Sequence, residues 1–185
     1  SQNLRAESIV ASFEKALDTV IELLPSCPKM PVAVNLGGGF GIPYFAGDSE
    51  LDIEVVGAGL QKAIKERQGQ LPGTSFIAET GRYLVGECGL FVCTVLYRKA
   101  SRGEVFLVVD GGMHQHLAAS GNFGQVIKRN YPITNPDRMH ENSSEEVNIV
   151  GPLCTPLDRL GTKTLIPHTN AGEFLAVFCS GAYGY

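Results

Sequence analysis

Apolar residues recur at helical spacing near the start of the chain. Between residues 4 and 24 they fall every three or four positions, at Ile9, Val10, Phe13, Ala16, Leu17, Val20, Ile21 and Leu24. This spacing predicts an amphipathic helix with one face in a core. Pro25 and Pro28 predict its end, because proline cannot continue a helix. Residues 51–67 show the same period, with Gly69 just beyond, and we expect four inward residues: Ile53, Val56, Leu60 and Ile64.

Two short apolar runs in the first half predict buried strands. Residues 32–36 lead into three consecutive glycines, and residues 74–78 end at Glu79. Strand, helix and strand in this order, with polar residues where the strands end, are typical of a β/α barrel. We therefore predict that residues 1–84 form an α/β domain.

The second half is rich in apolar runs typical of strands. Residues 84–99 and 104–110 flank Ser101, Arg102 and Gly103, a pattern that predicts a hairpin. Residues 147–150 and 173–178 predict further strands, and the polar residues 135–146 predict a surface loop. We predict an α/β plus all-β fold: the C-terminal part of a β/α (TIM-type) barrel, then a mostly antiparallel β-barrel domain over residues 85–185.

Length changes how this fold is interpreted. A complete β/α barrel needs about 250 residues, whereas the chain has 185. Only two or three barrel units fit, and no strand precedes the first helix. We therefore expect the chain to be part of a larger protein, with an incomplete β-domain.

Composition excludes several classes. Hydrophobic residues make up 44% and charged residues 18%, enough apolar content for a core. No apolar run reaches the roughly 20 residues of a membrane helix, and a net charge of −4 argues against a nucleic-acid partner. The five cysteines are odd in number and contain no CxxC pair. This argues against a zinc ribbon or a disulfide framework and favours reduced thiols in a cytoplasmic protein.

Glycines and charges follow the predicted strands. The segment Gly37-Gly38-Gly39-Phe40-Gly41 could bring backbone amides close to a phosphate or simply form a tight turn. It lacks the Gly-Lys-Ser/Thr of a P-loop. Glu79 and Arg82 could form a charged clamp for phosphate or carboxylate, or a solvated ion pair.

Three motifs in the second half also leave alternatives open. His114 and His116 alternate, as metal ligands on one strand face would, but no glutamate follows until Glu141. We favour a packed histidine pair and predict no metal site. Cys154 lies in a proline-flanked loop, where it could be either a structural or a reactive thiol. Tyr183 could simply close the core.

Taken in order, five motifs are more specific than any one alone: Gly37-Gly38-Gly39-Phe40, Glu79-x-Gly81-Arg82, Asp110-Gly111-Gly112, Gly151-Pro152-x-Cys154 and Gly181-Ala182-Tyr183. Together they resemble the fold-type III pyridoxal-phosphate decarboxylases, the ornithine, diaminopimelate and arginine decarboxylase family. The resemblance covers essentially the whole chain and the later part of the family's length. In motif the chain is most similar to exosortase-associated proteins and to butirosin-type enzymes that act on a carrier-tethered glutamyl group.

The resemblance implies a role for each matching residue. The phosphate of pyridoxal 5'-phosphate would be held by Ser1, Gly37, Gly38, Gly39, Gly81, Arg82 and Tyr183. Glu79 would pair with the pyridine nitrogen and keep it protonated. Cys154 would return a proton to Cα, reaching across a homodimer interface. The implied activity is decarboxylation of an amino acid or a carrier-tethered amino acid, with neither nucleic acid nor membrane as partner.

Departures from the family pattern shape the expected substrate. Thr80 replaces the usual proline, and Thr155 stands where diamine-forming members carry an acidic residue. The resemblance also implies that Asn122 replaces a second acidic contact. Without an anion to pair a distal ammonium, free lysine or ornithine is a poor expected substrate.

The family's cofactor-binding lysine would lie upstream of Ser1, and no lysine of this chain has a matching context. We therefore expect the 185 residues alone to be inactive. Three alternatives stay open: a non-catalytic homologue that acts by binding, an amino-acid racemase of the same fold type, and a metal-dependent β-barrel enzyme using His114 and His116.

Overall fold

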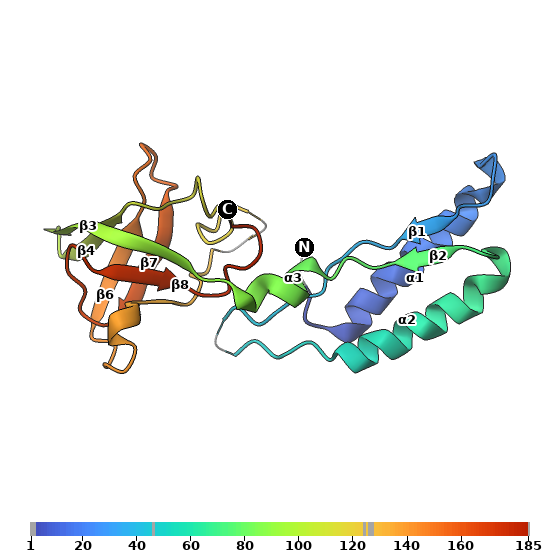
Figure 1. Cartoon of the computed structure of the whole chain (residues 1–185), viewed down its shortest axis with the longest axis horizontal. Helices are drawn as coiled ribbons and strands as arrows, with labels where there is room; N and C mark the ends of the chain where they lie inside the picture. The colour runs from blue at the N-terminus through green and yellow to red at the C-terminus, as the bar shows by residue number, and fades with distance from the viewer. Residues whose placement is uncertain (1–2, 46, 124, 126–127, 185) are drawn as a thin grey trace. The chain divides into compact units, whose positions relative to one another are not determined.

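The computed structural model describes residues 3–45, 47–123, 125 and 128–184. The chain divides into two compact units, Ser1–Leu84 and Val85–Tyr185. Figure 1 shows two long helices with a pair of strands in the first unit and a strand-rich second unit. None of the described helices combines the length and apolar character needed to cross a membrane.

The first unit packs two helices against a parallel strand pair. Helix α1 (Ala6–Leu23) is followed directly by a 3-10 turn over Leu24–Ser26. Pro25 is the second residue of this turn. Helix α2 (Ile53–Arg67) begins after Asp52, whose side chain accepts a hydrogen bond from the Val55 amide. The predicted helices are thus confirmed. Ile53 is exposed, contrary to expectation, whereas Val56 is fully buried.

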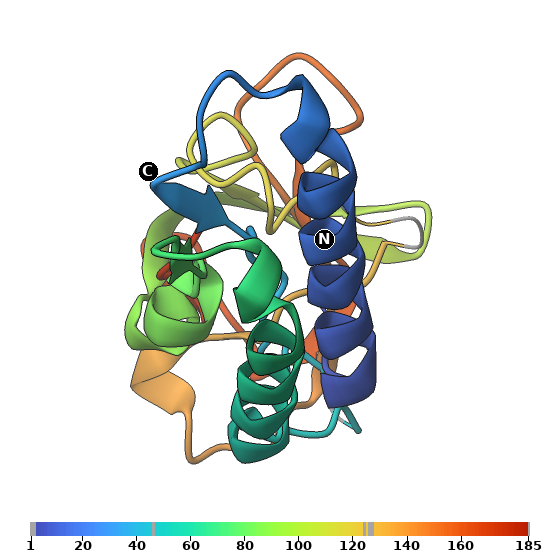
Figure 2. The same cartoon turned by 90° about the vertical axis from the view of Figure 1, so that its right-hand side faces the viewer.

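Strands β1 (Ala33–Asn35) and β2 (Ser75–Ile77) pair in parallel, with Val34 opposite Phe76. Helix α2 lies between them in sequence, which makes a β-α-β unit. Figure 2 shows α1 and α2 running side by side. A complete eight-stranded barrel does not occur among the described residues, since these are the two strands of this sheet. The core comprises Ala6, Ile9, Phe13, Leu17, Val34, Leu36, Phe40, Leu51, Val56, Ala63 and Leu71.

Helix α3 (Gly81–Val85) and a 3-10 turn (Gly86–Cys88) follow, so the strand expected from residue 84 begins only at Phe91. The Leu84 amide donates to the Thr80 carbonyl, a local helical bond that outweighs the strand tendency of the apolar pair at 84 and 85. Sequence periodicity could not separate these alternatives over so short a run.

The second unit is a six-stranded mixed sheet in the order β5-β8-β3-β4-β6-β7. Its strands are β3 (Phe91–Ser101), β4 (Glu104–Val109), β5 (Ile133–Thr134), β6 (Glu145–Val150), β7 (Arg159–Ile166) and β8 (Phe174–Val177). All neighbours are antiparallel except β4 and β6, which are parallel. The terminal strands β5 and β7 also contact each other, so the sheet is nearly closed.

The predicted hairpin between β3 and β4 is confirmed, with Ser101 paired to Glu104. Arg102 and Gly103 both have positive φ, as a two-residue turn of this hand requires. Two strands, β5 and β7, were not predicted. The expected loop over residues 135–146 contains a 3-10 turn at Pro136–Arg138 and the first residues of β6.

Candidate functional site

In the first unit, the ends of β1 and β2 bring the glycine segment next to Glu79. The Glu79 amide donates to the Gly37 carbonyl at 2.8 Å. Asn35, the last residue of β1, donates from Nδ2 to Glu79 Oε1 at 2.7 Å and accepts the Gly37 amide at 2.8 Å. Adjacent parallel strands end at the same edge, which explains how residues far apart in sequence meet here. Sequence reasoning missed Asn35, although its place at the strand end was a signal.

The glycines meet two physical requirements of this edge. Gly37 and Gly39 have positive φ, of 81° and 104°, which side-chain-bearing residues rarely adopt. A Cβ on Gly38 would lie 2.7 Å from the Glu79 carbonyl oxygen. Among the described residues, the amides of Gly38 and Gly39 donate to no acceptor, whereas the Gly37 amide is engaged by Asn35. Two amides are thus available to an anion at this loop.

Residues around this loop complete the first unit's donor set. The Asn3 amide donates to the Gly39 carbonyl, and Asn3 forms an isolated parallel bridge with Phe40. Ser1 lies outside the described residues. Arg82 places its guanidinium carbon 5.6 Å from the centre of the Tyr44 ring, a cation–π contact. Gly81 begins α3, and a Cβ there would meet nothing within 4 Å.

The donor set suits pyridoxal 5'-phosphate. A carboxylate can keep a ring nitrogen protonated, and amides with a guanidinium are the usual partners of a phosphate. The chemistry of these residues therefore fits that group.

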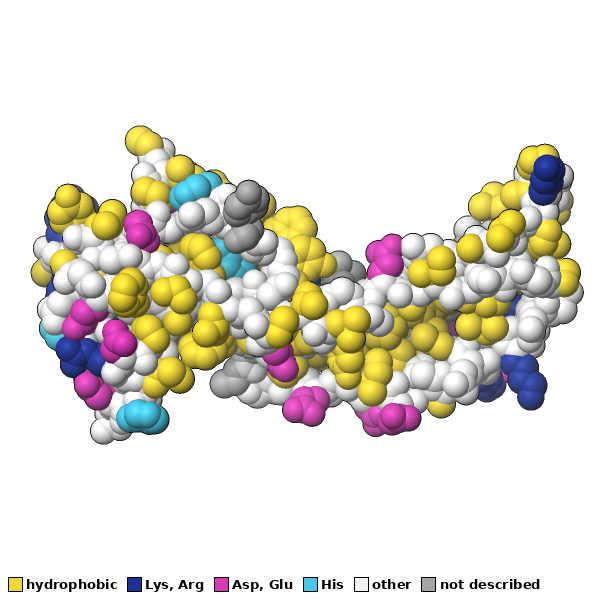
Figure 3. All heavy atoms as spheres, viewed as in Figure 1, with side chains coloured by type: hydrophobic (Ala, Val, Ile, Leu, Met, Phe, Trp, Pro, Cys, Tyr) yellow, Lys and Arg dark blue, Asp and Glu magenta, His cyan; other side chains and the backbone are white. Residues whose placement is uncertain are grey.

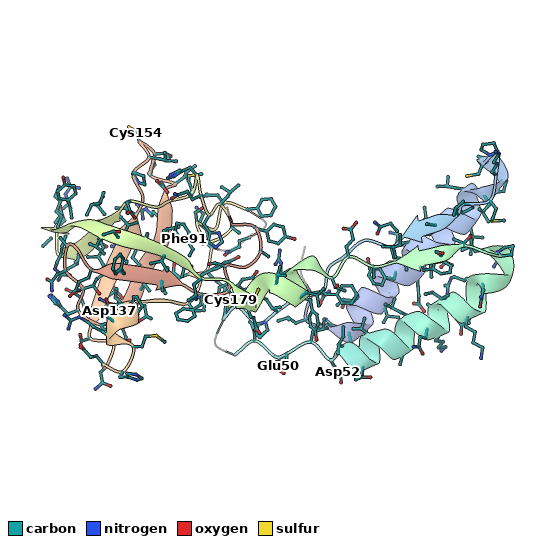
Figure 4. The ribbon with its side chains drawn as sticks, in the orientation of Figure 1. Glu50, Asp52, Phe91, Asp137, Cys154 and Cys179 are labelled. Carbon is teal, nitrogen blue, oxygen red and sulfur yellow. The ribbon has the colours of Figure 1, made fainter. Side chains whose placement is uncertain are left out.

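In the second unit, residues 151–158 connect β6 to β7 and are called the Cys154 loop below. Figure 4 shows Cys154 at the tip of this loop, and its side chain is exposed. Asp158 closes the loop: it is buried, and its carboxylate accepts hydrogen bonds from the Met113 amide (2.6 Å) and the Leu153 amide (2.8 Å). Asp158 was not singled out in the sequence.

Asn122 and Thr155 are both engaged within the Cys154 loop region. The Asn122 side-chain amide donates to the Leu157 carbonyl at 3.0 Å and to Ser120 Oγ at 2.8 Å, and its oxygen accepts Lys128 Nζ. The Thr155 hydroxyl accepts the Leu157 amide at 3.3 Å. Both polar side chains therefore contact the loop that bears Cys154.

The expected packed histidine pair is wrong for His114 and right for His116, and the two histidines do not share a strand face. They lie in the turn after β4, where His114 is exposed and His116 is fully buried. His116 packs edge-on against Phe91 and Tyr131, and its Nε2 lies 2.9 Å from Ser180 Oγ. Burial lowers the pKa of His116. No cluster of three or more metal-ligating side chains occurs in the described part of the chain.

Tyr183 follows the tight segment at the end of the second unit. It has φ of 62°, and its ring lies 5.4 Å from that of Phe123. The Ser180 and Gly181 amides donate to the Gly89 and Gly86 carbonyls, which fixes this segment against the start of the sheet. Tyr183 is about half exposed.

Two of the remaining cysteines, Cys93 and Cys179, are less exposed than Cys154. Burial raises the pKa of Cys93 to about 12, with a further contribution from the Asp110 carboxylate. Burial also raises the pKa of Cys179, as does the charge of Glu87. These two thiols are poorly suited to proton transfer near neutral pH.

Sequence comparison identifies relatives along the whole chain. It is 42% identical over 188 residues to the L-glutamyl-[BtrI acyl-carrier protein] decarboxylase of Niallia circulans, covering 100% of this chain and 44% of that protein. It is 31% identical over 194 residues to the diaminopimelate decarboxylase of Bacillus subtilis, covering 100% of this chain and 42% of that protein. The chain thus spans less than half the length of these curated relatives.

Comparison with solved structures agrees with the sequence comparison. The fold matches that of the diaminopimelate decarboxylase from M. jannaschii in co-complex with L-lysine, with a TM-score of 0.78 and 26% identity, over 100% of this chain and 41% of that one. The family model described as "Pyridoxal-dependent decarboxylase, C-terminal sheet domain" matches residues 10–181. The chain therefore belongs to the pyridoxal-dependent ornithine, diaminopimelate and arginine decarboxylase family.

Proposed function

We propose that the protein containing this chain is a lyase that decarboxylates an amino acid or a carrier-tethered amino acid with pyridoxal 5'-phosphate. The observation that carries the proposal is the joined edge of β1 and β2, where Glu79, Asn35 and the glycine segment are hydrogen-bonded together. The relatives support the substrate class, since one is named for a glutamyl group on an acyl-carrier protein. Thr155 supports a substrate without a distal ammonium.

In this proposal the family motifs supply the residues that bind the cofactor. Ser1, Gly37, Gly38, Gly39, Gly81, Arg82 and Tyr183 hold the phosphate, and Glu79 faces the ring nitrogen. When bound, the cofactor supplies an electron sink for the electrons left by the departing carboxylate. Glu79 keeps the ring nitrogen charged, and Asn35 holds the Glu79 carboxylate in place.

Cys154 acts in this proposal as the acid that returns a proton to the substrate Cα. Its exposure on the Cys154 loop supports contact with a second copy of the chain in a homodimer. The second unit also exposes apolar side chains (Figure 3), including Val92, Leu96 and Phe174, which a partner could cover.

The domain architecture of the chain and the cellular compartment of the protein are part of the same proposal. Residues 1–84 form the last part of a β/α barrel, a reading that the parallel pair joined through α2 supports, and residues 85–185 form the C-terminal sheet domain. All five cysteines are free thiols, which supports a reducing compartment such as the cytoplasm.

The experiment compares Cys154→Ala with the control Cys88→Ala, a second exposed thiol, in the full-length protein. We expect Cys154→Ala to lower product formation from glutamyl-carrier protein by about 100-fold, because general-acid groups contribute factors of this size. Cofactor absorbance and the mass gained on borohydride reduction should stay as in Cys88→Ala. Unchanged turnover in Cys154→Ala would refute the acid role. Failure of the unmodified full-length protein to bind the cofactor would instead favour a non-catalytic homologue.

A further inference from the structure

Asp158 carries a carboxylate that is almost completely removed from water, with 2% of the residue exposed. A buried charge is costly unless other groups compensate for it. Among the described residues no lysine, arginine or histidine forms an ion pair with Asp158. The compensation comes instead from two backbone amides: Met113 donates to Oδ1 at 2.6 Å and Leu153 donates to Oδ2 at 2.8 Å.

Two glycines make room for this carboxylate. A Cβ on Gly112 would lie 2.5 Å from Asp158 Oδ1, and one on Gly151 would also clash with the same carboxylate. The Gly151 amide also donates to the Asp158 carbonyl at 3.0 Å, which closes the base of the Cys154 loop. The glycines at 112 and 151 and the aspartate at 158 therefore form one packed arrangement.

This arrangement holds the backbone of Leu153, the residue that precedes Cys154. The amide that Oδ2 accepts belongs to Leu153, so the backbone entering Cys154 is held from inside while the thiol stays exposed. An exposed loop without such an anchor would sample many conformations. We infer that Asp158 is the positioning residue that fixes the orientation of the Cys154 thiol, with Gly112 and Gly151 required for its fit. The inference rests on the proposed role of Cys154 as acid.

The test uses Asp158→Asn in the full-length protein with its cofactor. The amide keeps the shape but can accept only one of the two N–H bonds, and its own NH₂ group opposes the other. We expect kcat to fall by about 10- to 100-fold because the acid is misplaced, while KM changes by less than about threefold. Asp137→Asn, an exposed aspartate of the same unit, is the matched control and should leave kcat unchanged.

A second readout needs no substrate. Iodoacetamide alkylation of Cys154, followed by peptide mass spectrometry, should be about threefold or more faster in Asp158→Asn, because the loop that bears the thiol is released. Cys27, exposed in the other unit, serves as the internal reference. Wild-type alkylation of Cys154 together with wild-type kcat would overturn the inference. Full turnover in Cys154→Ala would overturn the acid role instead, so the two failures can be told apart.

A double-mutant cycle tests the packed arrangement separately, through the stability of the protein. Gly151→Ala should lower the unfolding midpoint in the wild-type background but much less in the Asp158→Ala background, where the opposing carboxylate is gone. Equal effects of Gly151→Ala in both backgrounds would contradict the packed arrangement and overturn the inference.

Discussion

Asn35 Nδ2 donates a hydrogen bond of 2.7 Å to Glu79 Oε1, joining residues 44 positions apart at the ends of two parallel strands. The same Asn35 side chain accepts the Gly37 amide through its oxygen. The side-chain amide of Asn35 thus orients the Glu79 carboxylate, which is proposed to face the cofactor, and also binds Gly37, the first residue of the glycine segment.

Glu79→Gln should keep the bond to Asn35, because a carboxamide oxygen can still accept it, but should remove the charge. We expect decarboxylation to fall by about 100-fold or more, since electrostatic stabilisation of developing charge is a large part of catalysis. Steady-state kinetics of the full-length protein measure this. Glu54→Gln, on the exposed first turn of α2, is the control. Equal rates for the two variants would contradict the role of Glu79.

Gly38→Ala should destabilise the first unit, because its Cβ would lie 2.7 Å from a backbone oxygen that cannot rotate away. Overpacking of this kind costs about 1–3 kcal/mol. Gly57→Ala is the control: it lies inside α2 with open space around it and should stabilise by about 0.5–1 kcal/mol. Urea unfolding measures both. A neutral Gly38→Ala would show that the loop can move away from Glu79.

Stability should decrease as the pH falls from about 7 to 5.5, because of His116. Burial lowers its pKa in the folded state, so the unfolded chain binds the proton more readily below the ordinary histidine pKa of about 6.5. Protonation therefore favours unfolding. His116→Gln should flatten this part of the profile, whereas His140→Gln, at an exposed position, should not. Urea unfolding midpoints between pH 5.5 and 7.5 provide the measurement, and an unchanged slope in His116→Gln would count against the explanation.

Arg98 should contribute to the stability of the sheet unit. Its guanidinium on β3 pairs with Glu145 on β6 and donates to the Thr169 carbonyl at 3.0 Å, with both charged side chains largely removed from water. Arg98→Met leaves Glu145 without this partner and should cost about 1–3 kcal/mol. Arg102→Met in the exposed hairpin turn is the control. The Arg98 bond also lowers the pKa of Glu145, so this stabilisation should fade as pH falls below about 4.5.

Thiol labelling should distinguish the exposed cysteines from the buried Cys93. At pH 8 we expect iodoacetamide to modify the exposed Cys27, Cys88 and Cys154 in the native protein and to leave Cys93 unmodified. Cys93 is buried and its pKa is raised to about 12, so its reactive thiolate is scarce. Peptide mass spectrometry measures each site. Rapid modification of Cys93 would mean that β3 opens readily.

Much of the fold was determined by patterns that neighbouring residues carry by themselves. The period of apolar residues predicted α1 and α2, and the Arg102-Gly103 turn with its flanking apolar runs predicted the β3–β4 hairpin, because these elements depend on local geometry. The order of the short glycine, acidic and cysteine motifs was enough to indicate the family.

The tertiary structure decided what depends on distant partners. Strand β7 was missed because it is stabilised by pairing with β6, and His114 and His116 were separated by a turn that buries one of them. Asn35 and Asp158 look ordinary in the sequence. Their importance comes from a carboxylate 44 residues away for Asn35, and from the Met113 amide and the space left by Gly112 for Asp158. Hydrogen bonds and steric fit between remote segments exist only in the folded chain, so the sequence pattern could not reveal them.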